Sequence, residues 1–199
     1  TLAPTIPPQP TTPTVGIPST IGFSNQARPI LAYQFKNGPT QLVFVGAIHG
    51  GYEWNTALLA YEAIDYFTAI PDLVPDEVTL YIIPAANPDG LFRVTQREGR
   101  FERTDLIEDT IPGRFNANNV DLNRIWDCDW SPDAQWRQQP VNGGTAAFSE
   151  PEAVALRDFI TARRPVGVVF WHSAANGVYA AGCPETHPPS FALATQYGD

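Results

Sequence analysis

Short apolar runs and one amphipathic stretch organise the first half of the chain. Residues 31–35, 42–48 and 78–83 are rich in β-branched and aromatic side chains, which is typical of strands. The last of these runs is continuous, as expected for a strand buried on both faces. Residues 53–70 carry apolar side chains at helical spacing, and Pro71 ends that segment. Asn37-Gly38 between the first two runs predicts a β-hairpin.

The second half has a long stretch, residues 85–144, without clear periodicity, which we expect to be a functional loop region. Ser149-Glu150-Pro151-Glu152 then predicts a capping box that opens a helix through Arg163 and Arg164. A buried strand follows at residues 166–171. Alternating strands and helices predict an α/β fold, with a mixed, largely parallel sheet flanked by helices.

Composition bounds the fold and the partners. The chain has 199 residues and a formal net charge of −9, so it is sized for one domain and poorly suited to bind nucleic acid. No apolar run is long enough to span a membrane. Residues 1–20 are rich in Thr and Pro, which predicts an extended linker before a folded domain at residues 21–199. Methionine is absent, which indicates a processed or excised chain.

A Thr/Pro linker commonly follows a cleaved signal or a lipid anchor, so we expect a secreted or extracytoplasmic protein, tethered through this linker. The two cysteines, Cys128 and Cys183, suggest a disulfide in that setting. The alternative is two unrelated buried thiols.

Candidate metal chemistry lies at the strand ends. The chain has three histidines, and two of them, His49 and His172, each follow an apolar run. Glu53 comes within one helical turn of His49, and Gly50 and Gly51 allow a tight turn between them. Two imidazoles and one carboxylate form a typical ligand set for one catalytic Zn²⁺ ion, with a position left for water. The alternative is a pair of loop histidines and a glutamate that favours a helix N-terminus.

The order of motifs resembles the carboxypeptidase A-like family of zinc metallocarboxypeptidases. The resemblance covers about residues 21–182. It is carried by five segments in order: His49 with Glu53, Asn87-Pro88-Asp89-Gly90, Arg114 with Asp121-Leu122-Asn123-Arg124, Ser149-Glu150-Pro151-Glu152, and His172-Ser173. It implies a three-layer sandwich with one zinc ion held by the histidines and Glu53.

The same resemblance implies roles for four further residues. Arg114 would polarise the scissile carbonyl, which suits a guanidinium placed where negative charge develops. Asn123 and Arg124 would bind the terminal carboxylate of the substrate, because a guanidinium offers paired donors to two carboxylate oxygens. Asp121 would bind His49 from behind and fix its tautomer.

Departures from the family pattern concern spacing and the general base. Three residues separate His49 from Glu53 where the family has two, and Ile125 replaces the usual Asn after the Asn-Arg pair. The family's base glutamate and capping tyrosine come well after the second histidine, but Glu185 and Tyr197 lie too close to His172 to match. We therefore expect a domain incomplete at its C-terminus, whose base and specificity pocket lie beyond residue 199, or in a separate C-terminal polypeptide.

These patterns favour a zinc metallocarboxypeptidase that cleaves the C-terminal peptide bond by means of a zinc-activated water. Its substrates would be peptides or peptidoglycan stems with a free C-terminal carboxylate. The alternatives are an N-acyl amino acid deacylase of the same fold group and a zinc- and peptide-binding fragment without turnover.

Overall fold

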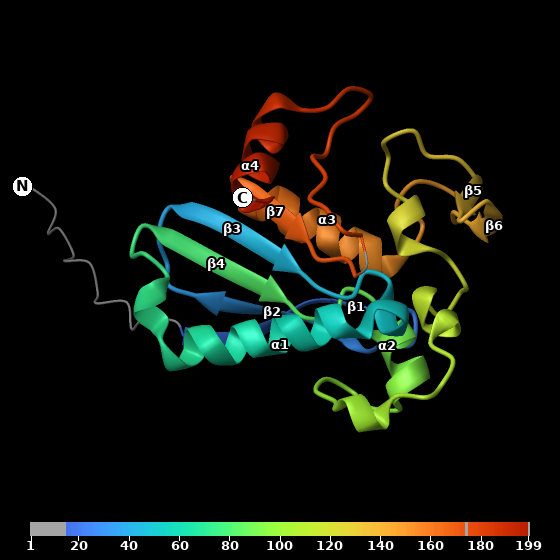
Figure 1. Cartoon of the computed structure of the whole chain (residues 1–199), viewed down its shortest axis with the longest axis horizontal. Helices are drawn as coiled ribbons and strands as arrows, with labels where there is room; N and C mark the ends of the chain where they lie inside the picture. The colour runs from blue at the N-terminus through green and yellow to red at the C-terminus, as the bar shows by residue number, and fades with distance from the viewer. Residues whose placement is uncertain (1–14, 174, 199) are drawn as a thin grey trace, which may run out of the picture.

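The computed structural model describes residues 15–173 and 175–198 (Figure 1). Its centre is a five-stranded sheet with the strand order β1-β2-β4-β3-β7. The strands are β1 (Val15–Phe23), β2 (Pro29–Phe35), β3 (Thr40–Val45), β4 (Val78–Ile83) and β7 (Gly167–Phe170). The helices are α1 (Trp54–Ala69), α2 (Pro88–Thr95), α3 (Pro151–Arg163) and α4 (Pro188–Gly198). A small separate hairpin consists of β5 (Asp133–Trp136) and β6 (Gln139–Asn142).

Strand β4 shows why the sheet is covered on both faces. Five of its six residues are buried, and successive side chains of a strand point to opposite faces. Leu80 and Ile82 pack with α1 residues in one apolar cluster. Tyr81 and Ile83 pack with α3 residues in another. Figure 1 shows α1 and α3 on opposite sides of the sheet, which is the three-layer arrangement expected of the fold class.

The sheet is mixed, and its parallel part contains the two strands that precede the histidines. β3 pairs in parallel with β4 on one side and with β7 on the other, whereas β1 and β2 are antiparallel. The predicted α/β fold is confirmed. The predicted hairpin between β2 and β3 is wrong, because β4 lies between these strands. A strand as apolar as β4 is buried best with a partner on each edge, and this outweighs the local Asn-Gly turn signal.

The N-terminal boundary differs from the one expected. β1 begins at Val15 and pairs with β2, so residues 15–20 belong to the sheet, although their composition predicted a linker through residue 20. Pairing with a neighbouring strand supplies the stability that these small side chains lack. The rest of the expected linker, residues 1–14, lies outside the described part of the chain.

The stretch from residue 85 to residue 144 contains more regular structure than its periodicity indicated. It includes α2, the β5–β6 hairpin and three short 3-10 turns, at Arg103–Asp105, Ile111–Arg114 and Leu122–Arg124. Asn87 begins α2, and its side-chain oxygen accepts a hydrogen bond from the Gly90 amide at 2.9 Å. The Asn-Pro-Asp-Gly motif is thus a helix N-cap with proline in the first turn.

Helix α3 begins differently from the predicted capping box. Its N-cap residue is Glu150, whose side chain makes no capping hydrogen bond, with Pro151 at the first helical position. Ser149 donates instead to the Glu150 carboxylate at 3.2 Å. The capping-box prediction is therefore wrong by one residue, because Glu150 and Glu152 bind asparagine side chains of other segments. The predicted end at Arg163 and Arg164 is confirmed.

Strand β7 forms an edge of the sheet as described here, and α4 lies beside it (Figure 1). A domain incomplete at its C-terminus should expose apolar surface along residues 166–171. Val166 is 71% exposed, but the residues of β7 are half-buried. The indole of Trp171 donates a hydrogen bond to the Tyr197 hydroxyl of α4 at 3.0 Å. Among the described residues, no helix is both long and apolar enough to cross a membrane.

Candidate metal centre

His49 and His172 come together because they follow neighbouring parallel strands. β3 and β7 are paired in register from Leu42 with Gly167 to Val45 with Phe170. Their carboxyl ends therefore meet at one edge of the sheet, which is where α/β sheets bind ligands. The two imidazole rings lie 5.0 Å apart, centroid to centroid.

Glu53 reaches both histidines across a 3-10 turn, Gly50–Glu53. Its Oε1 lies 3.1 Å from Nδ1 of His49, and its Oε2 lies 3.0 Å from Nδ1 of His172. Gly50 has a φ of +45°, and a Cβ there would collide with the carbonyl oxygen of Gly113. The longer spacing between His49 and Glu53 is thus accommodated by a turn that needs glycine.

The three side chains form a group that could hold a metal ion. One ligand atom from each of His49, Glu53 and His172 lies within 4.8 Å of the other two. His49 and Glu53 are buried, and His172 is half-buried. The two ring nitrogens of His49 are buried without a hydrogen-bond partner among the described residues, although carboxylates lie nearby. Buried polar atoms normally have partners, so these unpaired nitrogens fit a site built for a cation with nitrogen and oxygen ligands, such as zinc.

Electrostatics keep the acidic ligand ionised. Burial raises the pKa of Glu53, but its hydrogen bond with His172 and its proximity to His49 lower the pKa by more, to about 2. Burial lowers the pKa of His49, and the carboxylates of Asp121 and Glu53 raise it by more. A metal ion and a proton therefore compete for His49, and metal binding releases that proton.

Asp121 lies behind His49, and Arg114 lies behind Asp121. Oδ1 of Asp121 is 3.5 Å from Nε2 of His49, and its Oδ2 accepts two hydrogen bonds from Arg114. Arg114 is only 2% exposed but lines the pocket at the metal group. Its guanidinium also lies over the rings of Trp136 and Tyr52, at 4.3 Å and 5.7 Å from their centroids.

The Asn123-Arg124 pair is divided between two pockets. Arg124 lines the pocket of about 380 Å³ that contains the metal group. It also lines an adjoining pocket of about 190 Å³, and Asn123 lines only the adjoining one. The Arg124 side chain donates to the backbone carbonyls of Gln135 and Asn123, at 2.9 Å and 2.7 Å. Glu53 is the only carboxylate among the described lining residues of the larger pocket. Glu185 is exposed and outside that lining.

The loop that carries Arg114 and Asp121 is held by the start of α3. The amide of Asn116, a fully buried residue, donates to Glu150 at 2.7 Å and to Glu152 at 3.3 Å. The side-chain oxygen of Asn116 accepts from the Val120 amide at 2.9 Å. The Ser-Glu-Pro-Glu segment thus acts on the site from a distance, by fixing this loop.

Several residues of the pocket had no assigned role in the sequence, and three of them have large side chains. Tyr52, Trp136 and Arg137 line it, the last two from the β5–β6 hairpin. Polar and apolar residues alternate over only the four residues of β5 and do not alternate in β6, which is too short a signal to predict a hairpin over the metal group.

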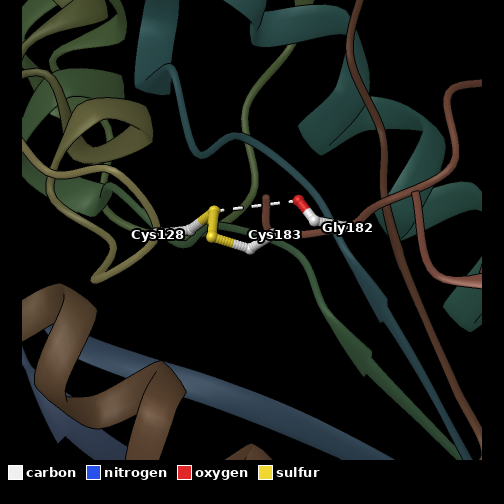
Figure 2. The surroundings of a disulfide bond; sticks show 3 residues. All are labelled: Cys128, Gly182 and Cys183. Atoms are coloured by element: carbon white, nitrogen blue, oxygen red, sulfur yellow. Dashed lines mark hydrogen bonds between the residues drawn. A yellow bond between two sulfur atoms is a disulfide. The ribbon is translucent and has the colours of Figure 1, made fainter. Parts of the chain in front are cut away.

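Cys128 and Cys183 form a disulfide, with their Cα atoms 5.7 Å apart (Figure 2). Cys128 lines the adjoining pocket, so the disulfide lies at the rim of the site. It connects the segment that follows Arg124 with the segment that follows His172. Sγ of Cys128 lies 3.7 Å from the carbonyl oxygen of Gly182 (Figure 2).

Comparison with known proteins decides the family. The model of the zinc carboxypeptidase family matches residues 11–191. The chain belongs to the zinc carboxypeptidase family. The expected resemblance is thus confirmed.

Relatives agree with this family. The chain is 34% identical over 144 residues to bacteriocin BCN5 of Clostridium perfringens, a match that covers 70% of this chain and 14% of the bacteriocin. It is 27% identical over 192 residues to gamma-D-glutamyl-L-diamino acid endopeptidase 1 of Lysinibacillus sphaericus, covering 85% and 48% of the two chains.

The fold matches a solved carboxypeptidase A from Helicoverpa armigera with a TM-score of 0.68 and 22% identity. The match covers 92% of this chain and 48% of the insect enzyme. The chain therefore spans about half of the endopeptidase and of the insect enzyme, and a smaller share of the bacteriocin.

Proposed function

We propose that this chain binds one zinc ion through His49, Glu53 and His172, and that the protein hydrolyses the C-terminal peptide bond of peptides. The observation that carries the proposal is the meeting of these three side chains, with one ligand atom of each within 4.8 Å of the other two. Zinc, when bound, supplies a Lewis acid and lowers the pKa of a water molecule.

The chain's own residues would position the substrate. Arg124 lines the pocket and, among the described residues, pairs with no carboxylate, so its charge remains for the terminal carboxylate of a peptide. Arg114 is fixed by Asp121 and would stabilise negative charge on the carbonyl oxygen under attack. Asn123 would assist Arg124 from the adjoining pocket. We propose that the proton acceptor comes from residues beyond 199 or from a separate C-terminal polypeptide.

We propose peptides of the peptidoglycan stem as one substrate class. The support is the name of the Lysinibacillus relative, an endopeptidase acting at gamma-D-glutamyl-L-diamino acid bonds. Such a substrate lies outside the cytoplasm, where a disulfide also persists. We therefore propose secretion or an extracytoplasmic location, with the Thr/Pro segment at residues 1–14 as part of a tether.

A second candidate function is binding of zinc and a peptide without turnover. It is favoured by the single carboxylate in the described pocket lining, Glu53, which the metal would occupy. Loss of a general base lowers rates by about 10² to 10⁴. An N-acyl amino acid deacylase is a further alternative within the fold group, and the substrate trial below separates it from a peptidase.

Metal titration tests the site. Calorimetry and metal analysis should give one Zn²⁺ per chain, and His49→Ala or Glu53→Ala should abolish binding. His187→Ala is the matched control, because His187 is an exposed loop histidine outside the metal group. Equal zinc binding by the wild type and the His49→Ala variant would refute the assignment.

Hydrolysis tests the reaction. A blocked dipeptide and the corresponding N-acetyl amino acid are offered to the zinc-loaded protein together with the polypeptide that supplies the proton acceptor, with and without a chelator. Cleavage of the dipeptide alone supports the carboxypeptidase, and cleavage of the acetyl compound alone supports the deacylase. Zinc-dependent peptide binding without cleavage supports the second candidate.

A further inference from the structure

The β5–β6 hairpin brings into the metal pocket an arginine that the proposed reaction does not use. Arg137 and Gln138 form the turn between the two strands, with φ values of +50° and +63°. Such left-handed pairs are typical of two-residue hairpin turns. Arg137 is an exposed residue, yet it lines the pocket together with His49, Glu53 and His172.

Aromatic packing restrains the Arg137 side chain. Its Cζ lies 5.0 Å from the ring centroid of Trp136, within the range of a cation–π interaction. Trp136 in turn has the guanidinium of Arg114 at 4.3 Å and the ring of Tyr52 at 5.1 Å. The main-chain oxygen of Gln135, one residue earlier, accepts from Arg124. One short strand therefore connects Arg114, Arg124 and Arg137 around the pocket.

The charge of this pocket is opposite to that of the chain. The net charge of the chain is −9, yet three arginines line this pocket. Asp121 neutralises Arg114. Among the described residues, the arginines in ion pairs are Arg28, Arg97, Arg100, Arg114 and Arg157. Arg124 and Arg137 therefore leave two positive charges for the substrate, although one terminal carboxylate needs only one.

We propose that Arg137 binds a second carboxylate of the substrate and selects peptides with two acidic groups near the scissile amide. This inference rests on the proposed function, in which Arg124 binds the first carboxylate. The second carboxylate has two chemical sources. It is the side chain of an acidic C-terminal residue, or the free α-carboxylate of a glutamate joined through its γ-carboxyl group.

Matched ligands separate these sources. Benzoyl-glycyl-glutamate is compared with benzoyl-glycyl-glutamine. γ-Glutamyl-lysine is compared with the same dipeptide in which the α-carboxylate of the glutamate is an amide. Each pair therefore differs only in a carboxylate against a carboxamide. The zinc-loaded wild type, Arg137→Gln and Arg137→Lys are tested, with KM and kcat measured where turnover occurs and Kd by calorimetry where it does not. Arg164→Gln is the control, because Arg164 is also exposed, has a φ of +49° and lies outside the pocket lining.

We expect the wild type and Arg164→Gln to prefer the carboxylate form of one pair by about 1.4- to fivefold, the range for an exposed ion pair. Arg137→Gln should remove this preference with kcat unchanged, and Arg137→Lys should restore part of it. The preference should weaken with added salt. An unchanged preference in Arg137→Gln, or none in the wild type, would overturn the inference. Absence of turnover in protein that includes the proton acceptor, together with an Arg137-dependent Kd preference, would instead refute the proposed reaction alone.

Discussion

Arg114 donates two hydrogen bonds to a single oxygen of Asp121, from Nε at 3.0 Å and from Nη2 at 2.8 Å. The two side chains are 2% and 0% exposed, and the other oxygen of Asp121 faces His49. Burial raises the pKa of Asp121, while His49 and Arg114 lower it by more, to about 2. Asp121 thus joins the arginine to the candidate metal ligand as a permanent anion.

Asp121→Asn should destabilise the protein, because it leaves the Arg114 guanidinium buried without a counter-charge. Breaking a buried pair by removing one partner costs about 3–5 kcal/mol of unfolding free energy. Loss of a group that orients a metal-bound histidine lowers metal affinity by about 10- to 100-fold. Urea unfolding and zinc titration measure the two effects. Asp65→Asn, in the exposed pair with Arg100, is the control and should change little. If Asp121→Asn unfolded with its midpoint at the same urea concentration as the wild type, the prediction would be contradicted.

Gly50→Ala should distort the turn between His49 and Glu53. Gly50 has a φ of +45°, and an added Cβ would meet the Gly113 carbonyl oxygen. Strain of this kind costs about 1–3 kcal/mol, and the shifted turn should weaken zinc binding. Gly99→Ala is the control, since Gly99 has a φ of +77° and its nearest neighbour would be the Tyr61 hydroxyl at 3.9 Å. If the two variants lost equal stability and zinc affinity, the contact between the added Cβ at residue 50 and the Gly113 carbonyl oxygen would not explain the effect.

Glu152→Gln should change how stability depends on pH. Burial raises the pKa of Glu152 in the folded protein, against weaker opposing hydrogen bonds from Asn25 and Asn116. The folded state therefore retains a proton that the unfolded state releases, and the wild type loses stability as the pH rises from the ordinary glutamate pKa of 4.5 through the raised value. The variant lacks this decline, so its stability relative to the wild type should increase across that window. Urea unfolding from acid to neutral pH gives the unfolding free energy of the wild type and of Glu152→Gln. If the two free energies changed in parallel with pH, the raised pKa of Glu152 would be disproved.

Removal of the disulfide should lower the unfolding free energy by about 4 kcal/mol in the chain-entropy model. The two cysteines are 55 residues apart, so the disulfide closes a long loop in the unfolded chain. Denaturant unfolding of the Cys128→Ser/Cys183→Ser double variant measures the loss, and wild type treated with reductant should behave alike. Detection of two free thiols in the native protein by mass spectrometry would contradict the observed disulfide.

Local patterns in the sequence determined the elements and pointed to the chemistry. The apolar runs predicted β3, β4 and β7, and the histidines at their ends predicted where a metal could bind, because parallel strands end at a common edge. The glycines after His49 predicted a turn that accommodates the longer spacing to Glu53, and the structure has that turn. These features depend on short stretches of chain and on the period of each element.

Only the tertiary structure decided which distant segments meet. The Asn-Gly turn predicted a β2–β3 hairpin, but β4 takes the place between these strands, since strand pairing depends on burial across the whole sheet. Glu150 and Glu152 bind Asn116 across more than thirty residues instead of capping α3, as separations of 34 and 36 residues show. Arg137 reaches the metal pocket on a hairpin whose periodic signal is limited to four residues. Each outcome is set by which buried polar and apolar groups find partners in the folded chain, and that information does not lie in any local window of the sequence.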